Sequence, residues 1–170
     1  MKLTDEYIIP FHGLKEEVRE YNFDAGSEFF EFYQNPDYTG GQLKVKVLFS
    51  RKPQFIELKF NITGQITVIC DRCLEDVFLP VNLDELLIVR FGEKYDEPDN
   101  NIIIIPKEDT RINIAQYIYE FAILSLPFRK VHPDSQSCNP EMIKIIEEHS
   151  EYNVFTDPRW DKLKNIKSIK

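Results

Sequence analysis

The feature that most constrains this 170-residue chain is a run of apolar residues at every second position from Ile56 to Cys70. Polar residues fill the positions between them, apart from Ile69, and Gly64 takes one place on the apolar face. Period two is typical of a β-strand with one buried and one solvated face. A straight strand of this length would extend about 50 Å, against the usual ~20 Å. We therefore expect it to bend, and Gly64 is the natural position for a kink or bulge.

A second alternating run, from Val77 to Phe91, follows closely on the first. Together the two runs predict a long β-hairpin whose tip is the segment 71–76. Pro80 cannot donate a hydrogen bond to a ladder, so we expect this second strand to start at a sheet edge or to be interrupted there. Glu85 breaks the apolar face of the run.

Shorter patterns predict further strands. Residues 43–49 alternate after Gly40-Gly41, which is typical of a turn, and residues 102–105 form a short apolar run after an acidic loop at 92–101. In the less regular N-terminal third, strands are predicted at 7–11, 19–23 and 28–33.

Two helices are predicted in the C-terminal half. The first covers residues 113–126, with Asn113 and Gln116 in the spacing of a capping box and Pro127 at its end. The second opens at Asn139-Pro140, an N-cap followed by proline at the first helical position. Its inward stripe is predicted to consist of Met142, Ile145, Ile146 and His149.

These elements predict an α+β fold. We expect an antiparallel, β-rich sheet or barrel-like core that carries the long hairpin, with two helices in the C-terminal half. The length suits one domain over residues 1–150, followed by a basic tail at 151–170.

The three cysteines indicate structural or metal chemistry. Cys70 and Cys73, at the hairpin tip, can bring two thiolates to one ion, and zinc takes about four such ligands. Cys138 and His132 are the candidates for the third and fourth ligands, if the fold brings them to the hairpin. The alternative is that the thiols are free and only pack. A redox pair is disfavoured, because a strand pattern with negative charge follows Cys73, whereas a reactive pair sits at a helix N-terminus.

The net charge limits the kinds of partner that this chain is expected to bind. Its 21 basic and 29 acidic residues give a net charge of −8, the wrong sign for a domain that coats nucleic acid. The segment 157–170 differs, because five basic residues there face two acidic ones and apolar residues recur at three-residue steps. It is predicted to be a basic amphipathic helix or a segment that orders on binding, with a solvated end as the alternative.

The sequence carries none of the common motifs of other functional classes. We expect a cytoplasmic protein, because the start lacks the pattern of a signal peptide and no segment is apolar enough to span a membrane. No phosphate-binding glycine loop, nucleophile elbow or HExxH motif occurs. We therefore expect a protein that binds partners, with no catalytic residues, no small-molecule substrate and no membrane.

Three segments resemble the YceD family, the large ribosomal RNA subunit accumulation proteins. They are Cys70-Asp-Arg-Cys73-Leu-Glu, the segment INIAQYIYEFAILSLPFRKVH leading to Cys138, and the closing DPRWDKLKNIK. The resemblance covers roughly residues 60–165. Two departures are that only Cys138 follows the Leu-Pro segment and that the closing motif reads Asp-Pro-Arg-Trp in place of the commoner Asn-Pro-Phe.

The resemblance implies a non-enzymatic role in the accumulation of large-subunit ribosomal RNA or in ribosome assembly. The partner would be a ribosomal protein or a ribosomal RNA precursor, reached indirectly or through the tail. The residues predicted to contact it are Arg159, Trp160, Lys162, Lys164 and Lys167. A zinc- or thiol-dependent enzyme and a general protein-interaction module remain as alternatives.

Overall fold

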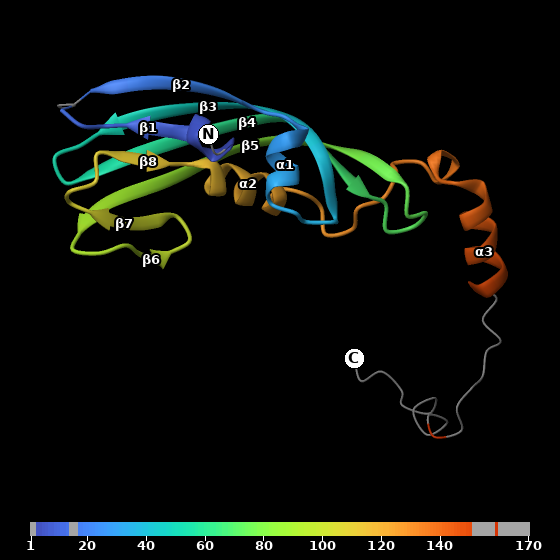
Figure 1. Cartoon of the computed structure of the whole chain (residues 1–170). Helices are drawn as coiled ribbons and strands as arrows, with labels where there is room; N and C mark the ends of the chain where they lie inside the picture. The colour runs from blue at the N-terminus through green and yellow to red at the C-terminus, as the bar shows by residue number, and fades with distance from the viewer. Residues whose placement is uncertain (1–2, 14–16, 151–158, 160–170) are drawn as a thin grey trace, which may run out of the picture.

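A six-stranded sheet forms the body of the molecule in a computed structural model that describes residues 3–13, 17–150 and 159 (Figure 1). The strand order is β2-β3-β4-β5-β7-β6, and all neighbours are antiparallel except β5 and β7, which are parallel. The strands are β2 (Val18–Ala25), β3 (Tyr38–Arg51), β4 (Phe55–Ile69), β5 (Asp76–Gly92), β6 (Asp96–Asp99) and β7 (Ile102–Pro106).

The remaining elements lie on one face of this sheet or at its end (Figure 1). They are η1 (Leu3–Tyr7), β1 (Ile8–Pro10), α1 (Ser27–Phe32), β8 (Arg111–Asn113), α2 (Ala115–Leu124), η2 (Ser135–Ser137) and α3 (Pro140–Ser150). The predicted α+β class is confirmed. The barrel-like alternative is wrong, because the edge strands β2 and β6 do not pair with each other. No helix in the described ranges is long and apolar enough to cross a membrane.

The predicted hairpin is the centre of the sheet. β4 and β5 pair without a register shift from Phe55–Arg90 to Ile69–Asp76. The even-numbered apolar side chains of β4 face the core, and those of Ile56, Leu58 and Ile62 are fully buried. The alternation in the sequence thus gives both the strand and its buried face.

Gly64 lets the long strand β4 pass close under β3. Its φ of +146° lies in a region that side chains rarely allow, and a Cβ there would come within 2.1 Å of the Gln42 carbonyl oxygen. Gly64 pairs with Leu43 on one side and Val81 on the other without a register shift, so the predicted bulge is absent there and the irregularity is confined to the positive φ of Gly64.

The N-terminal third corrects two predictions. Residues 28–33 are predicted as a strand but belong to α1, because a helix lets the adjacent Phe29 and Phe30 both enter the core, whereas neighbours on a strand face opposite sides. Gly40-Gly41 is predicted as a turn but lies within β3. The lack of a side chain at Gly41 makes room for Phe30, whose Cε2 would lie 2.6 Å from a Cβ at that position.

The helix α2 lies on the same face of the sheet, where Phe121 meets Phe60 edge to face at 5.3 Å between ring centroids. Its predicted capping box does not form. The Asn113 Oδ1 accepts a hydrogen bond from the Ala115 N–H at 2.9 Å, but Gln116 bonds to Glu120 further along the helix.

The helix α3 starts as predicted, since Asn139 Oδ1 accepts hydrogen bonds from the Glu141 and Met142 N–H groups at 2.9 and 3.4 Å. The predicted inward stripe is wrong beyond Met142. Ile145 and Ile146 are 48% and 41% exposed, and His149 is exposed too. The reason is that α3 leads away from the sheet, so that among the described residues its first turn alone, with Met142 and Ile143, packs against the core (Figure 1).

Two short strands, β6 and β8, are absent from the predictions. β6 has the sequence Asp-Glu-Pro-Asp, all exposed, and therefore shows no apolar alternation. It forms because β7 offers a neighbour, and it makes the outer edge of the sheet.

Candidate metal centre

The hairpin tip closes in a tight turn that holds two thiols on one side. The Cys70 N–H donates to the Glu75 carbonyl at 2.8 Å, and the Leu74 N–H donates to the Cys70 carbonyl at 2.9 Å. Leu74 has a φ of +61°, a left-handed conformation in which glycine is more common. The turn therefore forms without a glycine, the residue from which a turn of this kind is usually predicted.

A distant segment docks on this tip. The Asp71 N–H donates to the Lys130 carbonyl at 2.7 Å, and the Lys130 N–H donates to the Asp71 carboxylate at 2.6 Å. Further along, the Asn139 side-chain amide donates to the Glu75 carboxylate at 2.7 Å. These bonds hold the segment between Lys130 and Asn139 against the tip on both sides of a small cluster.

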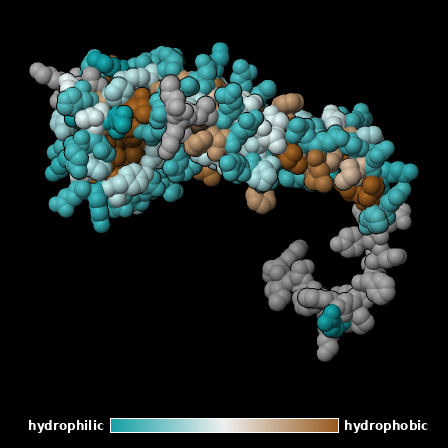
Figure 2. Space-filling model, in the orientation of Figure 1, coloured by the Kyte–Doolittle hydropathy of each residue, from teal (hydrophilic) through white to brown (hydrophobic). Residues whose placement is uncertain are grey.

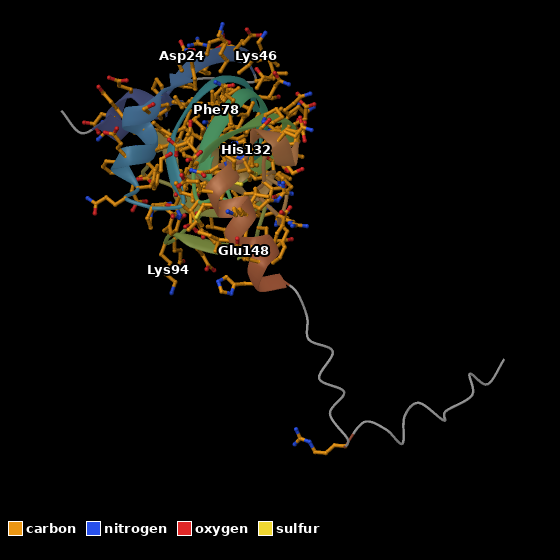
Figure 3. All side chains as sticks on the ribbon, turned by 90° about the vertical axis from the view of Figure 1, so that its right-hand side faces the viewer. Asp24, Lys46, Phe78, Lys94, His132 and Glu148 are labelled. Carbon is orange, nitrogen blue, oxygen red and sulfur yellow. The ribbon has the colours of Figure 1, made fainter. Side chains whose placement is uncertain are left out.

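That cluster consists of Cys70, Cys73, His132 and Cys138, and we call it the cysteine–histidine cluster. Its four candidate ligand atoms lie within 4.8 Å of one another. The His132 Nδ1 lies 3.6 Å from the sulfur of Cys73 and 3.6 Å from that of Cys138. Figure 3 views this end of the molecule, with His132 in front of the sheet and α3 running from it towards Glu148.

The donor set fits a zinc ion. Zinc–sulfur and zinc–nitrogen bonds of about 2.3 and 2.0 Å in a tetrahedron place sulfur and nitrogen about 3.5 Å apart. The separation between His132 and its two neighbouring thiols, 3.6 Å, is close to this value. All three cysteines are buried and His132 is half-buried, as in closed sites.

Hydrogen bonds around Cys70 favour the ionised form of its thiol, which is the form that binds a cation. Burial opposes ionisation of Cys70, but the backbone N–H groups of Cys73, Arg72 and His132 outweigh it and lower the pKa of the thiol to about 6. For Cys138, burial and the neighbouring Cys73 thiol raise the pKa, while Arg72 acts in the opposite direction. The surroundings therefore favour the thiolate of Cys70, the form that binds metal, and favour the neutral thiol of Cys138.

Arg72 is a residue of this site that the predictions from sequence missed. Its Nη1 donates to the Cys138 sulfur at 3.6 Å. Three thiolates around one Zn²⁺ leave a net charge of −1, which the guanidinium offsets. Its place between the two cysteines of the CxxC motif was the only signal in the sequence.

We expect Arg72→Met to weaken zinc binding by about tenfold, because partners of metal ligands typically contribute that much to affinity. Competition with a coloured chelator measures the change. Arg90→Met, at an exposed position of β5, is the matched control and should leave the affinity unchanged. Equal affinities for both variants would show that Arg72 does not act on the metal.

The structure brings together all four residues predicted as ligands. The predicted partner-binding residues Arg159, Trp160, Lys162, Lys164 and Lys167 lie outside the described residues, except for Arg159, which is exposed.

One comparison with known proteins gives a match. The family model described as large ribosomal RNA subunit accumulation protein YceD matches residues 58–167. This range contains the second half of the sheet, α2, α3 and the whole cysteine–histidine cluster. No curated protein and no solved structure matches the chain.

Proposed function

Because this chain belongs to the YceD family of large ribosomal RNA subunit accumulation proteins, we propose that it is a non-enzymatic factor in the accumulation of that RNA. It acts by binding a ribosomal protein or a ribonucleoprotein particle during assembly of the large subunit. The family match carries this proposal. The acidic body supports contact with basic protein more than broad contact with phosphate.

The cysteine–histidine cluster has a structural role in this proposal. Cys70, Cys73, His132 and Cys138 would hold a zinc ion with four protein ligands and leave no open position for water or substrate, which is typical of structural sites. Held in this way, the segment 130–139, and with it the start of α3, would be fastened to the hairpin tip. This closed donor set is the observation that favours a binding factor over a zinc- or thiol-dependent enzyme.

The partner contact is proposed to involve the C-terminal tail. The five residues predicted for this role, Arg159, Trp160, Lys162, Lys164 and Lys167, follow α3 in the sequence. Fixing the start of α3 therefore fixes where the tail leaves the body. Hydrophobic residues are visible on the surface at this end of the molecule (Figure 2). Ile145 and Ile146 of α3 are exposed.

Deletion of the gene tests the function. We expect less large-subunit RNA relative to small-subunit RNA, fewer large subunits in a sedimentation profile, and the tagged protein in fractions that contain large-subunit precursors. The full chain should restore the profile. Unchanged RNA ratios together with no co-sedimentation would contradict the proposal.

A chain ending at residue 156 tests the tail. We expect the same melting temperature as the full chain but no rescue of the deletion, because the tail contributes binding and not folding. A scrambled tail of the same composition is the control, since it keeps the charge and loses the order of residues. A truncated chain that fails to fold, or that rescues fully, would contradict the role given to the tail.

A further inference from the structure

One edge of β5 has no strand beside it in the described part of the chain. β5 pairs with β4 from Asp76 to Arg90, but with β7 only from Ile88 to Gly92. The Ile88 N–H donates to the Asn101 carbonyl at 2.8 Å, so it points to the β7 side. Antiparallel strands alternate the direction of these groups, so the backbone groups of every second residue before Ile88 point to the same side.

The residues with such backbone groups are Asn82, Asp84 and Leu86. Within the described ranges, no hydrogen bond satisfies their N–H and C=O groups on that side. Pro80 comes next in the same series and has no N–H to leave unpaired, which agrees with a strand edge at this position. This stretch can accept a further strand.

A groove lies beside this edge on the inner face of the sheet. It has a volume of about 950 Å³ and is bordered by β5, β6, the turn at 100–101 and α2. Its floor is apolar, with the buried Tyr117 and Phe121, and Leu124 stands 81% exposed at its wall. Four carboxylates line it: Glu85, Glu97, Asp99 and Glu120.

The charge of this inner groove is unbalanced. None of its four carboxylates forms an ion pair with a lysine or arginine of the described residues. Glu85 belongs to the core-facing series of β5, where it interrupts an apolar run. Glu85 lines the groove, where the core does not cover the sheet, and this explains why a charged residue is accepted in the apolar run of β5.

The outer face beside the same edge is open too. A second groove of about 530 Å³ is lined by Asp84, Leu86 and Leu48, and it shares Glu85 and Asn101 with the inner groove. Space is thus available on both sides of the β5 edge, where an added strand would place its alternating side chains.

We propose that an extended lysine- and arginine-rich segment of a partner protein adds to the sheet as a strand along residues 82–86 of β5. Main-chain hydrogen bonds give this mode its affinity, and side-chain pockets give it specificity. Basic side chains on one side of the added strand meet the carboxylates of the inner groove, and apolar ones on the other side meet Leu86. Nucleic acid is a poor occupant, because its phosphates carry the same charge as the groove.

This inference deepens the proposed function by naming the kind of segment bound, and rests on that function only for its biological role. The probe is a synthetic peptide of alternating lysine and valine, with a glutamate–valine peptide as the control. Fluorescence anisotropy measures binding of each peptide to the full chain. At low salt only the lysine peptide should bind, and its affinity should fall as the salt concentration rises. Bound peptide should slow hydrogen exchange at the Asn82, Asp84 and Leu86 amides.

Charge-neutral variants test the groove. The triple variant E85Q/D99N/E120Q should bind the lysine peptide about tenfold more weakly or worse, because these rim charges attract it. E31Q/E93Q/E108Q removes the same net charge at exposed positions elsewhere and is the matched control. Equal weakening in both triple variants would show only general attraction and would overturn the proposal.

Backbone variants test the added strand. Leu86→Pro removes the outward N–H and should abolish binding, whereas Leu86→Ala keeps that N–H and should bind with a smaller loss. A lysine–valine peptide N-methylated at alternate residues makes the same test on the unaltered protein, and it should not bind. Full binding of the methylated peptide would overturn strand addition.

The cellular outcome separates this inference from the proposed function. If gene deletion lowers large-subunit RNA and E85Q/D99N/E120Q restores it fully without binding the peptide, the groove is not the partner site and the proposed function stands. If the peptide binds as expected but deletion leaves the RNA unchanged, the proposed function fails and the strand site stands.

Discussion

Cys138→Ser is expected to lower the melting temperature of the zinc-loaded protein by roughly 8–16 °C. Free zinc at about 1,000 times its dissociation constant adds about 4 kcal/mol to stability by linkage. For a chain of this size, each kcal/mol corresponds to roughly 2–4 °C. Cys138 is the ligand to replace, because it lies in the docked segment and its loss leaves the hairpin residues intact. Differential scanning calorimetry measures the shift.

A chelator provides the control for this prediction. It should lower the melting temperature of the wild-type protein to that of Cys138→Ser, and it should not change the variant further. Hydrogen exchange should rise in residues 130–150 and stay slow in β3, β4 and β5, since a metal held by the cluster would join the two parts and would not build the sheet. A wild-type protein that contains no zinc and ignores the chelator would favour the alternative that the thiols only pack.

Gly64→Val is expected to destabilise the protein by about 4 kcal/mol or more, or to prevent folding, the range in which severe single substitutions fall. The backbone at Gly64 has a φ of +146°, and any Cβ would overlap the Gln42 carbonyl oxygen at 2.1 Å. β3 and β4 would have to separate at the middle of their ladder to relieve this contact. Urea denaturation followed by circular dichroism measures the loss, and a variant that never folds shows it directly.

Gly26→Ala is the matched control for Gly64. A Cβ at Gly26 meets nothing within 4 Å, and its φ is −91°, so the change should cost less than about 1 kcal/mol. Equal stabilities for Gly64→Val and Gly26→Ala would mean that the strands do not pass as closely as described.

The hairpin could be predicted from the sequence because its signal is local and long. Alternation from Ile56 to Cys70 and again from Val77 to Phe91 leaves one face apolar in each strand, and a register slip of one residue would turn one of these faces to solvent. The grouping of the four candidate ligands could be predicted because a zinc site needs a fixed number of nitrogen and sulfur donors, and His132 and Cys138 are among the few available.

The parts that could not be predicted depend on contacts between distant segments. Phe29 and Phe30 are helical because both enter the core, and Gly41 of β3 makes room for Phe30, a contact that no window of the sequence shows. β6 exists only because β7 is next to it. The stripe of α3 follows helical periodicity, yet Ile145 and Ile146 are exposed, because no element of the described residues covers them.

The distance along the chain between the two halves of the cysteine–histidine cluster has a consequence for biosynthesis. Cys73 and His132 are 59 positions apart, so the donor set is incomplete until residue 138 has left the ribosomal exit tunnel. The hairpin can form earlier, because its contacts are between neighbouring strands. Binding of a metal by all four residues would therefore follow formation of the hairpin, and in a cell short of zinc the sheet would form while the segment 130–139 stayed unanchored.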